Sequence, residues 1–313
     1  MVLAKTRWRQ TLKKRCLLWF GGLILFLLVG GASFAVCFMI VSLNQSEQPT
    51  EEEIVVIRPD DEPQKPAKPT VKTIDFQATI DNWAASAGGQ KGIIIYDLDL
   101  DKTVGSYNAD QKFATASLYK LFVVYEGYRR VQNGTMDANA IAGSTGYTVG
   151  ECLDLAIRES YSPCAETIWA MVGRDELDSI VQNDFKMPNM VVSDLEATPA
   201  EIMQILKIYY EHSDVKDETL LTKMKDSFLN QPITTYDWRQ GLPKGFSDKA
   251  LVYNKVGWNW DGRVWQIYDD AAIVNFVNEN RSFIVVVMAS GVTFQSIRSL
   301  GSQIEQTFYN VYQ

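Results

Sequence analysis

The stretch Phe113-Ala-Thr-Ala-Ser-Leu-Tyr-Lys-Leu-Phe-Val-Val-Tyr125 decides the fold, because it places a serine three residues ahead of a lysine at the start of an apolar helix. Side chains at positions i and i+3 share a helix face, so the amine of Lys120 can reach the oxygen of Ser117 and, once deprotonated, act as its general base. The only histidine, His212, lies in a charged stretch. A serine–histidine–acid triad is therefore disfavoured, and a serine–lysine pair is expected.

Strand patterns occur on both sides of this helix, and mostly helical patterns follow it. A capping box with proline at the first helical position marks a helix start at Thr198. We expect a helix over 75–87, a strand hairpin over 92–107, a mainly helical segment over 118–210, strands over 250–255, 264–276 and 282–290, and a helix over 295–312. This order predicts an α/β protein of the α+β type, with one antiparallel five-stranded sheet flanked by helices and a separate helical lobe.

The charge distribution is uneven. The net charge is −8, but six cations precede the first acidic residue, so the chain beyond residue 15 carries −14. Phosphate binding needs clustered cations, and this acidic body has no basic patch. We therefore expect no nucleic-acid partner.

An uncharged segment from Leu17 to Leu43 follows the basic N-terminus. It exceeds the roughly 20 apolar residues that a helix needs to span a bilayer. Residues 1–16 are basic, and acidic residues follow the span, which predicts a cytoplasmic N-terminus and an extracytoplasmic body. A cleavable signal peptide with a weak site near residues 32–35 is the alternative, but signal cores are usually shorter. The length favours an uncleaved anchor at the cell membrane over 17–43.

Residues 44–72 read as an acidic, proline-rich stalk without a core of its own. Residues 73–313 then remain, with a balanced apolar and polar content that suits one sizeable domain. We expect a single-pass membrane protein with a monomeric external domain.

Two further sequence boxes follow the serine–lysine pair in order, Ser160-Tyr-Ser162 at a helix start and Lys255-Val-Gly257 at a strand end. The spacing alone proves little, because Ser213-Asp-Val-Lys216 repeats it in a polar turn. With all three boxes in order, the chain resembles the class A β-lactamases and penicillin-binding proteins, whose signature is serine-x-x-lysine, serine-x-asparagine and lysine-threonine-glycine. The resemblance covers most of residues 75–313.

The resemblance implies roles for the residues of the three boxes. Ser117 would attack an amide carbonyl and form an acyl-enzyme, and Lys120 would take its proton. Ser160 would relay a proton to the leaving nitrogen. Lys255 would favour a neutral Lys120 and attract a substrate carboxylate. The backbone N–H groups of Ser117 and Trp258, which follows Gly257, would form the oxyanion hole.

The chain departs from the family pattern in three places. Ser162 stands where asparagine usually closes the second box, and Val256 stands where threonine usually lies in the third. Only 25 residues separate Gly173 from Pro199, which leaves no room for the family's long Ω loop with its deacylating glutamate. Glu196 is a candidate for that acid, although a solvated loop residue is the simpler interpretation.

Cys152 and Cys164 are the only cysteines of the external part. Outside the cytoplasm they can form a disulfide, and two buried thiols are the alternative. Two cysteines without a nearby histidine are too few for a zinc site. We expect no metal and no cofactor.

These features predict a membrane-anchored serine hydrolase that faces the cell wall and is acylated by β-lactams or by D-alanyl-D-alanine wall peptides. The shortened loop predicts slow deacylation, which favours a DD-peptidase role or a weak β-lactamase. The alternative is a catalytically silent binding or sensing module that keeps the fold. Ser162 and Val256 favour that alternative. The residues that favour an enzyme are Ser117, Lys120, Ser160 and Lys255.

Overall fold

The computed structural model describes residues 71–212, 214–231, 237–260 and 265–312. The predicted basic tail and membrane span, and all but the last two residues of the predicted stalk, lie outside these ranges. No helix within the described ranges is both long and apolar enough to cross a membrane. In chain order, the elements are α2 (Gln77–Ser86), β1 (Gln90–Asp97), β2 (Lys102–Tyr107), β3 (Phe113–Ala114), η1 (Ala116–Tyr119), α3 (Lys120–Gln132), α4 (Val149–Arg158), α5 (Ser162–Val172), α6 (Arg174–Asn183), η2 (Val192–Asp194), β4 (Glu196–Ala197), α7 (Pro199–Glu211), α8 (Glu218–Leu229), η3 (Leu242–Gly245), β5 (Ala250–Trp260), β6 (Trp265–Phe276), β7 (Arg281–Ser290) and α9 (Phe294–Tyr312).

One five-stranded sheet forms the centre of the domain, in the order β2-β1-β7-β6-β5. All of its neighbouring strands are antiparallel. The first hairpin therefore pairs with the last strand, and the two ends of the domain's sequence form one sheet. The predicted α+β fold with a five-stranded antiparallel sheet is confirmed.

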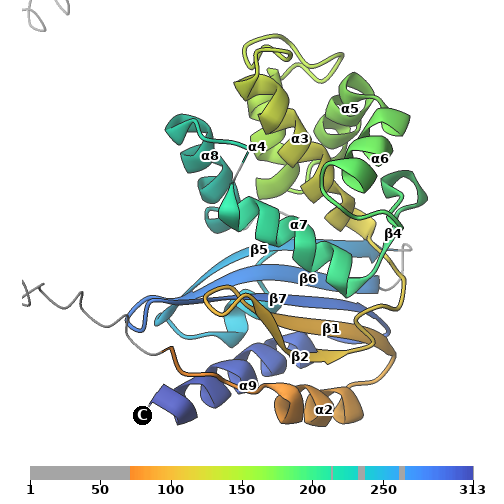
Figure 1. Ribbon diagram of the computed structural model, residues 1–313. Coiled ribbons are helices and arrows are strands. Elements are labelled where there is room, and N and C mark those ends of the chain that lie inside the picture. Colours follow the sequence, from red (N-terminus) through yellow and green to blue (C-terminus); the bar gives the residue numbers. More distant parts are fainter. Residues whose placement is uncertain (1–70, 213, 232–236, 261–264, 313) are drawn as a thin grey trace, which may run out of the picture. The chain divides into compact units, whose positions relative to one another are not determined.

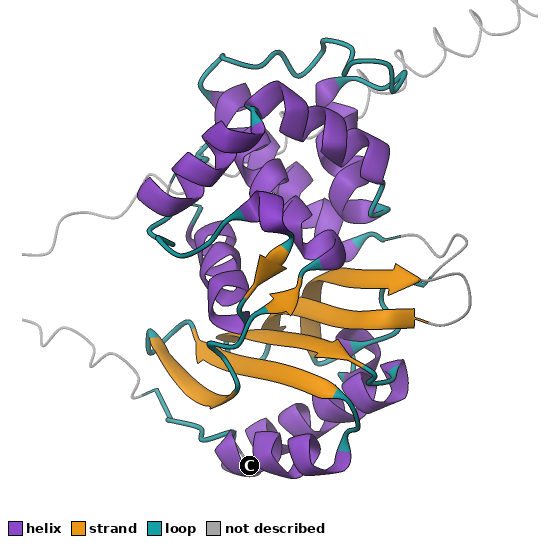
Figure 2. Ribbon diagram, turned by 90° about the vertical axis from the view of Figure 1, so that its right-hand side faces the viewer, coloured by secondary structure: helices purple, strands orange, loops and turns teal. Residues whose placement is uncertain are grey.

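Helices cover both faces of this sheet (Figures 1 and 2). On one face, α2 and α9 pack against an apolar cluster that includes Val252, Val274 and Phe308. On the other face, the helical lobe from α3 to α8 packs against a second cluster that includes Ile273 and Val286. Each sheet face buries alternate residues, so the side chains of one strand are divided between two cores.

Strand β5 is longer than the sequence pattern predicted. The expected strand over 250–255 continues to Trp260, and β5 stays paired with β6 over this length. Lys255 therefore lies in the middle of an edge strand, not at its end. The apolar alternation continues through Val256, Trp258 and Trp260, so the predicted strand was ended too early.

The helix start at Thr198 is as predicted. The Thr198 side chain accepts a hydrogen bond from the backbone N–H of Glu201, whose carboxylate accepts one from the Thr198 backbone. A second capping box, which the pattern analysis missed, starts α4 at Thr148. These caps satisfy helix N–H groups that have no partner within the helix.

A clamp of side chains holds the first described residues against the end of the chain. Arg281, at the start of β7, donates hydrogen bonds to the backbone oxygen of Lys72 at 2.8 Å, to the Asp97 carboxylate and to the Tyr312 hydroxyl. The Lys72 ammonium donates to the backbone oxygen of Val311 at 2.7 Å. Arg281 and Asp97 are both buried, and each compensates the charge of the other.

Candidate active site

Ser117 lies in a tight turn that the sheet and the β3–β4 pair hold in place. The residue before it, Ala116, has a φ of 40°, a left-handed conformation that costs a non-glycine residue free energy. The backbone N–H of Thr115 donates to the oxygen of Leu195 at 2.8 Å, and the N–H of Leu118 donates to the oxygen of Thr115 at 2.8 Å. Strained backbone that its surroundings enforce is typical of functional sites.

The expected apolar helix begins one turn later than the pattern suggested. Ser117 belongs to the 3-10 turn η1, and the α-helix begins at Lys120. Ser117 is partly exposed, whereas Lys120 is fully buried. Among the described residues, the Ser117 hydroxyl has no hydrogen-bond partner. Hydrogen bonds between catalytic groups are often loose before substrate binds, so this geometry is compatible with the predicted serine–lysine pair.

Lys120 points from α3 to the loop before α5. Its Nζ donates to the backbone oxygen of Ser160 at 2.5 Å and to Ser162 Oγ at 3.0 Å, and it lies 3.4 Å from Ser160 Oγ. Burial lowers the pKa of Lys120 to about 8, and the negative charge of Glu166 partly opposes this shift. A lysine with such a pKa is neutral in a substantial fraction of molecules near neutral pH.

Lys255 approaches Ser160 from the sheet. Its Nζ lies 2.9 Å from Ser160 Oγ and donates to the backbone oxygen of Val256 at 2.7 Å. Only 1% of Lys255 is exposed. Burial, and then the charge of Lys120, lower the pKa of Lys255 well below its ordinary value. The two amines therefore compete for protons, and the Ser160 hydroxyl lies within hydrogen-bond distance of both.

The backbone of Ser160 is itself unusual, with a φ of 54°. A disulfide between Cys152 and Cys164 joins α4 to α5 on either side of this residue. The sequence left open whether these cysteines form a disulfide or stay two buried thiols, and the structure contains the disulfide. The bridge holds the ends of the loop that presents the Ser160 hydroxyl and backbone oxygen to Lys120.

The third box lies on two faces of β5. Lys255 and Tyr253 face the helical lobe, whereas Val252 packs with the α9 layer. Alternation along the strand places Val256 and Trp258 on the α9 face, away from the Lys255 side chain. Val256 is 1% exposed. The Trp258 ring contacts the Phe294 ring, with centroids 4.4 Å apart. These two residues can therefore serve a substrate mainly through their backbone.

Gly257 brings β5 against the turn 115–119 that carries Ser117, the predicted nucleophile, and this turn is called the nucleophile turn below. A Cβ atom at this position would lie 2.4 Å from the Thr115 backbone oxygen and 2.9 Å from Leu118 Cγ. Only glycine permits this approach, which explains physically why the third box has a glycine at this position. Asp269 lies opposite Gly257 on β6 and is fully buried. Burial raises the pKa of Asp269 well above its ordinary value.

Glu196, the candidate deacylation acid, lies on the short strand β4. It pairs with Ala114, three residues before Ser117. Its side chain is exposed and makes no hydrogen bond within the described ranges. Its role as the deacylation acid stays a prediction.

Ser162 is exposed at the start of α5 and contacts Lys120 through its hydroxyl.

A second acid near the lysines was missed by the sequence analysis. Glu166 accepts a hydrogen bond from the Tyr119 hydroxyl at 2.6 Å and one from Arg174 at 2.5 Å. Arg174 lies over the Trp169 ring, 4.1 Å from its centroid. Glu166 follows Ser162 by four residues on α5, so helical spacing alone could have placed both on the face toward η1. No group of three or more metal-ligating side chains occurs within the described ranges.

Comparison with known proteins agrees with this arrangement. The family model described as the beta-lactamase enzyme family matches residues 75–312. No curated protein matches the chain. Among solved structures, a β-lactamase from Burkholderia vietnamiensis has a TM-score of 0.64 at 15% identity, and the alignment covers 74% of this chain and 96% of that chain.

Two further structures show the same fold. A β-lactamase from Xanthomonas campestris pv. campestris has a TM-score of 0.62 at 12% identity, with 74% of this chain and 96% of that chain covered. An ancestral class A β-lactamase has a TM-score of 0.62 at 15% identity, with 75% and 100% covered. At such low identities these likenesses concern the fold alone. Together with the family model that matches most of its length, they show that the chain belongs to the beta-lactamase enzyme family.

Proposed function

We propose that this protein is a membrane-anchored, extracytoplasmic serine hydrolase that is acylated at Ser117 by β-lactams or by D-alanyl-D-alanine wall peptides. One observation carries the proposal. The Ser160 hydroxyl lies 2.9 Å from Lys255 Nζ and 3.4 Å from Lys120 Nζ. A hydroxyl between two buried amines that compete for protons can move a proton in either direction.

Acylation then proceeds in balanced steps. Neutral Lys120 takes the proton of Ser117 Oγ as the oxygen attacks the carbonyl carbon of the substrate amide. The tetrahedral intermediate collapses when the carbon–nitrogen bond breaks. Ser160 gives its proton to the leaving nitrogen and is reprotonated from the lysine pair. The product is an ester at Ser117, and the proton released at the start ends on the nitrogen.

Backbone donors would stabilise the negative charge that develops on the substrate oxygen. The N–H groups of Ser117 and Trp258 are the candidates, because Gly257 brings β5 against η1. Removing one such donor typically lowers the rate by about a hundredfold or more.

The positions of the two acids near the site lead us to expect slow deacylation. Glu196 is exposed and its side chain makes no hydrogen bond within the described ranges, and the Glu166 carboxylate already accepts hydrogen bonds from Tyr119 and Arg174. A water molecule that attacks the ester needs a free base within hydrogen-bond reach. We therefore expect a long-lived acyl-enzyme, as in a wall-peptide enzyme or a weak β-lactamase.

Intact mass measured over time tests the proposal. The full-length chain in detergent is incubated with benzylpenicillin, and Ser117→Ala is the control. We expect an adduct on the wild type alone that persists for many minutes. Rapid loss of the adduct with product release would identify an efficient β-lactamase. The absence of an adduct with penicillin and with a D-alanyl-D-alanine ester would leave the silent binding module, which the exchanges at Ser162 and Val256 favour.

The membrane location needs its own test. The uncharged segment from Leu17 to Leu43 and its charged flanks support it. Protease added to intact spheroplasts should remove the domain from residue 71 onward and leave the basic N-terminus protected. Protection of the whole domain, or its recovery in the soluble fraction, would contradict the proposed topology.

A further inference from the structure

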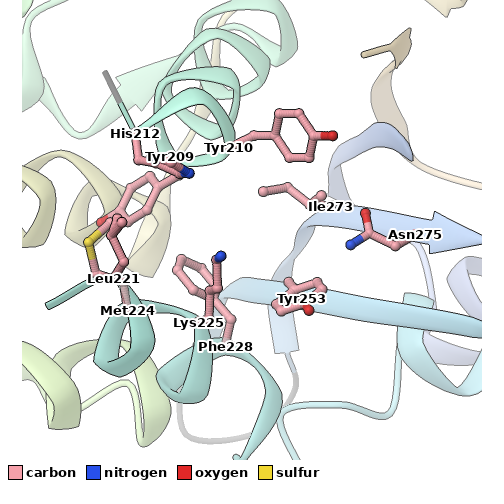
Figure 3. A pocket seen from close by; sticks show the side chains of 10 residues that line it. All are labelled: Tyr209, Tyr210, His212, Leu221, Met224, Lys225, Phe228, Tyr253, Ile273 and Asn275. Carbon is pink, nitrogen blue, oxygen red and sulfur yellow. The ribbon is translucent and has the colours of Figure 1, made fainter. Parts of the chain in front are cut away.

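A cavity of about 420 Å³ lies between the helices α7 and α8 and the strands β5 and β6 (Figure 3). Its volume lies within the range of small-molecule sites. None of Ser117, Lys120, Ser160 or Lys255 lines it. Its lining residues are Tyr209, Tyr210, His212, Leu221, Met224, Lys225, Phe228, Tyr253, Ile273 and Asn275.

The floor of the cavity is apolar and largely aromatic. Leu221, Met224 and Phe228 project from one face of α8 and are buried, and Tyr209 lies beside them with its ring against Phe228. The Tyr253 ring closes the side toward the sheet, as Figure 3 shows. A flat, apolar molecule would therefore find aromatic and aliphatic walls on both sides.

Several polar side chains of the cavity have no hydrogen-bond partner. Within the described ranges, the side chains of Lys225, His212, Tyr253 and Asn275 make no hydrogen bond, and Asn275 Oδ1 is buried without a partner. The Lys225 ammonium and the Asn275 amide extend into the space between α8 and the sheet from opposite sides (Figure 3). The lining contains a lysine and a histidine but no acid. Unused donors and a cation around an apolar floor match an anionic ligand with a ring.

We propose that this cavity is a binding site for a small aromatic carboxylate, distinct from the acylation site. The ring would lie against Phe228 and Met224, and the carboxylate would accept hydrogen bonds from Lys225 and the Asn275 amide. Burial, and then the nearby charge of Asp226, raise the pKa of Tyr253, so its phenol stays protonated and adds no charge that would repel the ligand.

Two residues that line the cavity also contact or adjoin the chain segments that carry the two catalytic lysines. The Tyr209 hydroxyl donates at 2.8 Å to the backbone oxygen of Leu121, the residue after Lys120. Tyr253 lies two residues before Lys255 on the same face of β5. An anion held here favours the protonated form of nearby amines, so it reduces the fraction of neutral lysine. Occupancy therefore slows acylation, a consequence that rests on the proposed function.

Binding is tested with naphthoate as the probe and naphthamide, its neutral isostere, as the comparison. Naphthoate fluorescence should titrate with a Kd of about 0.05–1 mM on the full-length protein. Lys225→Gln should weaken this binding about tenfold, whereas Lys223→Gln, an exposed lysine on the same helix that does not line the cavity, should leave it unchanged. Equal binding of naphthamide, equal effects of the two substitutions, or no binding up to about 10 mM would overturn the site.

The connection to acylation is measured separately, as the rate of penicillin adduct formation with and without saturating naphthoate. We expect a slowing of about two- to tenfold in the wild type, and the same slowing in Lys225→Gln should need about tenfold more naphthoate. An unchanged wild-type rate would overturn the connection. Binding is repeated on Ser117→Ala, which cannot be acylated, so a failure of the proposed function leaves the binding result intact.

Discussion

At the scale of single residues, the site depends on which amine holds a proton. Lys120 and Lys255 are both buried, both contact Ser160, and the pKa of each is lowered. Glu166 is the acid whose charge acts on Lys120, and it is held by Tyr119 and Arg174. We therefore expect Glu166 to act on the site through its charge.

Glu166→Gln removes that charge and should lower the pKa of Lys120 below its present value of about 8. Because neutral Lys120 is the proposed base, the acid limb of the acylation pH profile should move to lower pH. Acylation rates measured between pH 5 and about pH 9 check this. The control is Glu176→Gln, which also removes a carboxylate paired with an arginine, but one bound to Arg130 instead. A profile shifted equally in both variants, or in neither, contradicts the role of Glu166.

Val256→Thr tests whether the third box lacks a substrate contact. The family pattern alone suggests that threonine restores carboxylate binding. Val256 is instead 1% exposed, on the α9 face of β5. A hydroxyl there would be buried without a partner, at a cost of about 1–3 kcal/mol in the free energy of unfolding. We expect lower stability in urea and an unchanged acylation rate, and faster acylation would show that the side chain reaches the substrate.

At the scale of elements, the contact between β5 and η1 sets the distance between the lysine strand and the nucleophile. Gly257→Ala would place a Cβ atom 2.4 Å from the Thr115 backbone oxygen, so one of the two elements must move. Acylation should fall at least about a hundredfold, since a shift of about 1 Å costs this much in positioned catalysis. Gly88→Ala is the matched control, because its Cβ would meet only the Gly291 oxygen at 3.6 Å. Comparable losses in both variants would show general destabilisation instead.

The strand β6 contributes a buried acid to the same contact. Asp269 Oδ1 accepts a hydrogen bond from the backbone N–H of Ala289 at 2.9 Å, and Oδ2 is buried without a partner. Because burial raises its pKa in the folded state, the folded protein keeps a proton that the unfolded chain releases above its ordinary pKa of 3.8. Stability is therefore lost as pH rises from that value through the folded-state pKa, by at most about 1.4 kcal/mol per pH unit.

Asp269→Asn should remove this loss, since the amide keeps the acceptor and carries no charge at any pH. Unfolding in urea at pH 5 and at pH 8 checks the effect. The variant should gain stability over the wild type at the higher pH and differ less at the lower. A wild-type stability that rises from pH 5 to pH 8 relative to the variant contradicts a protonated Asp269.

Sequence patterns predicted the elements that repeat a simple period and missed those that depend on distant contacts. The order of strands and helices, the α+β class and the Thr198 cap followed from local spacing. The extension of β5 to Trp260 was missed, although Val256, Trp258 and Trp260 continue the apolar alternation and the strand stays paired with β6 beyond Lys255. Glu166 was overlooked because its significance depends on Tyr119 and Arg174, which three separate elements bring together.

At the scale of the whole molecule, the clamp around Arg281 joins the start of the described chain to its end. Arg281→Gln leaves the buried Asp97 carboxylate without its partner and should lower the free energy of unfolding by about 3–5 kcal/mol. Lys102→Gln, an exposed cation on β2, should change it little. Equal effects of the two substitutions in chemical denaturation would show that the Arg281–Asp97 pair does not stabilise the fold more than an exposed cation does.

The clamp is also the place where a force on the preceding chain would reach the domain. Arg281 begins β7 and pairs with the end of β6, so it lies at the opposite end of the strands from Trp258 and the nucleophile turn. A pull on the chain before Lys72 would reach the domain first at this clamp, through the hydrogen bond between Arg281 and the Lys72 backbone oxygen. Ser117 lies at the other end of the strands, so we expect its geometry to change little when the preceding chain is pulled.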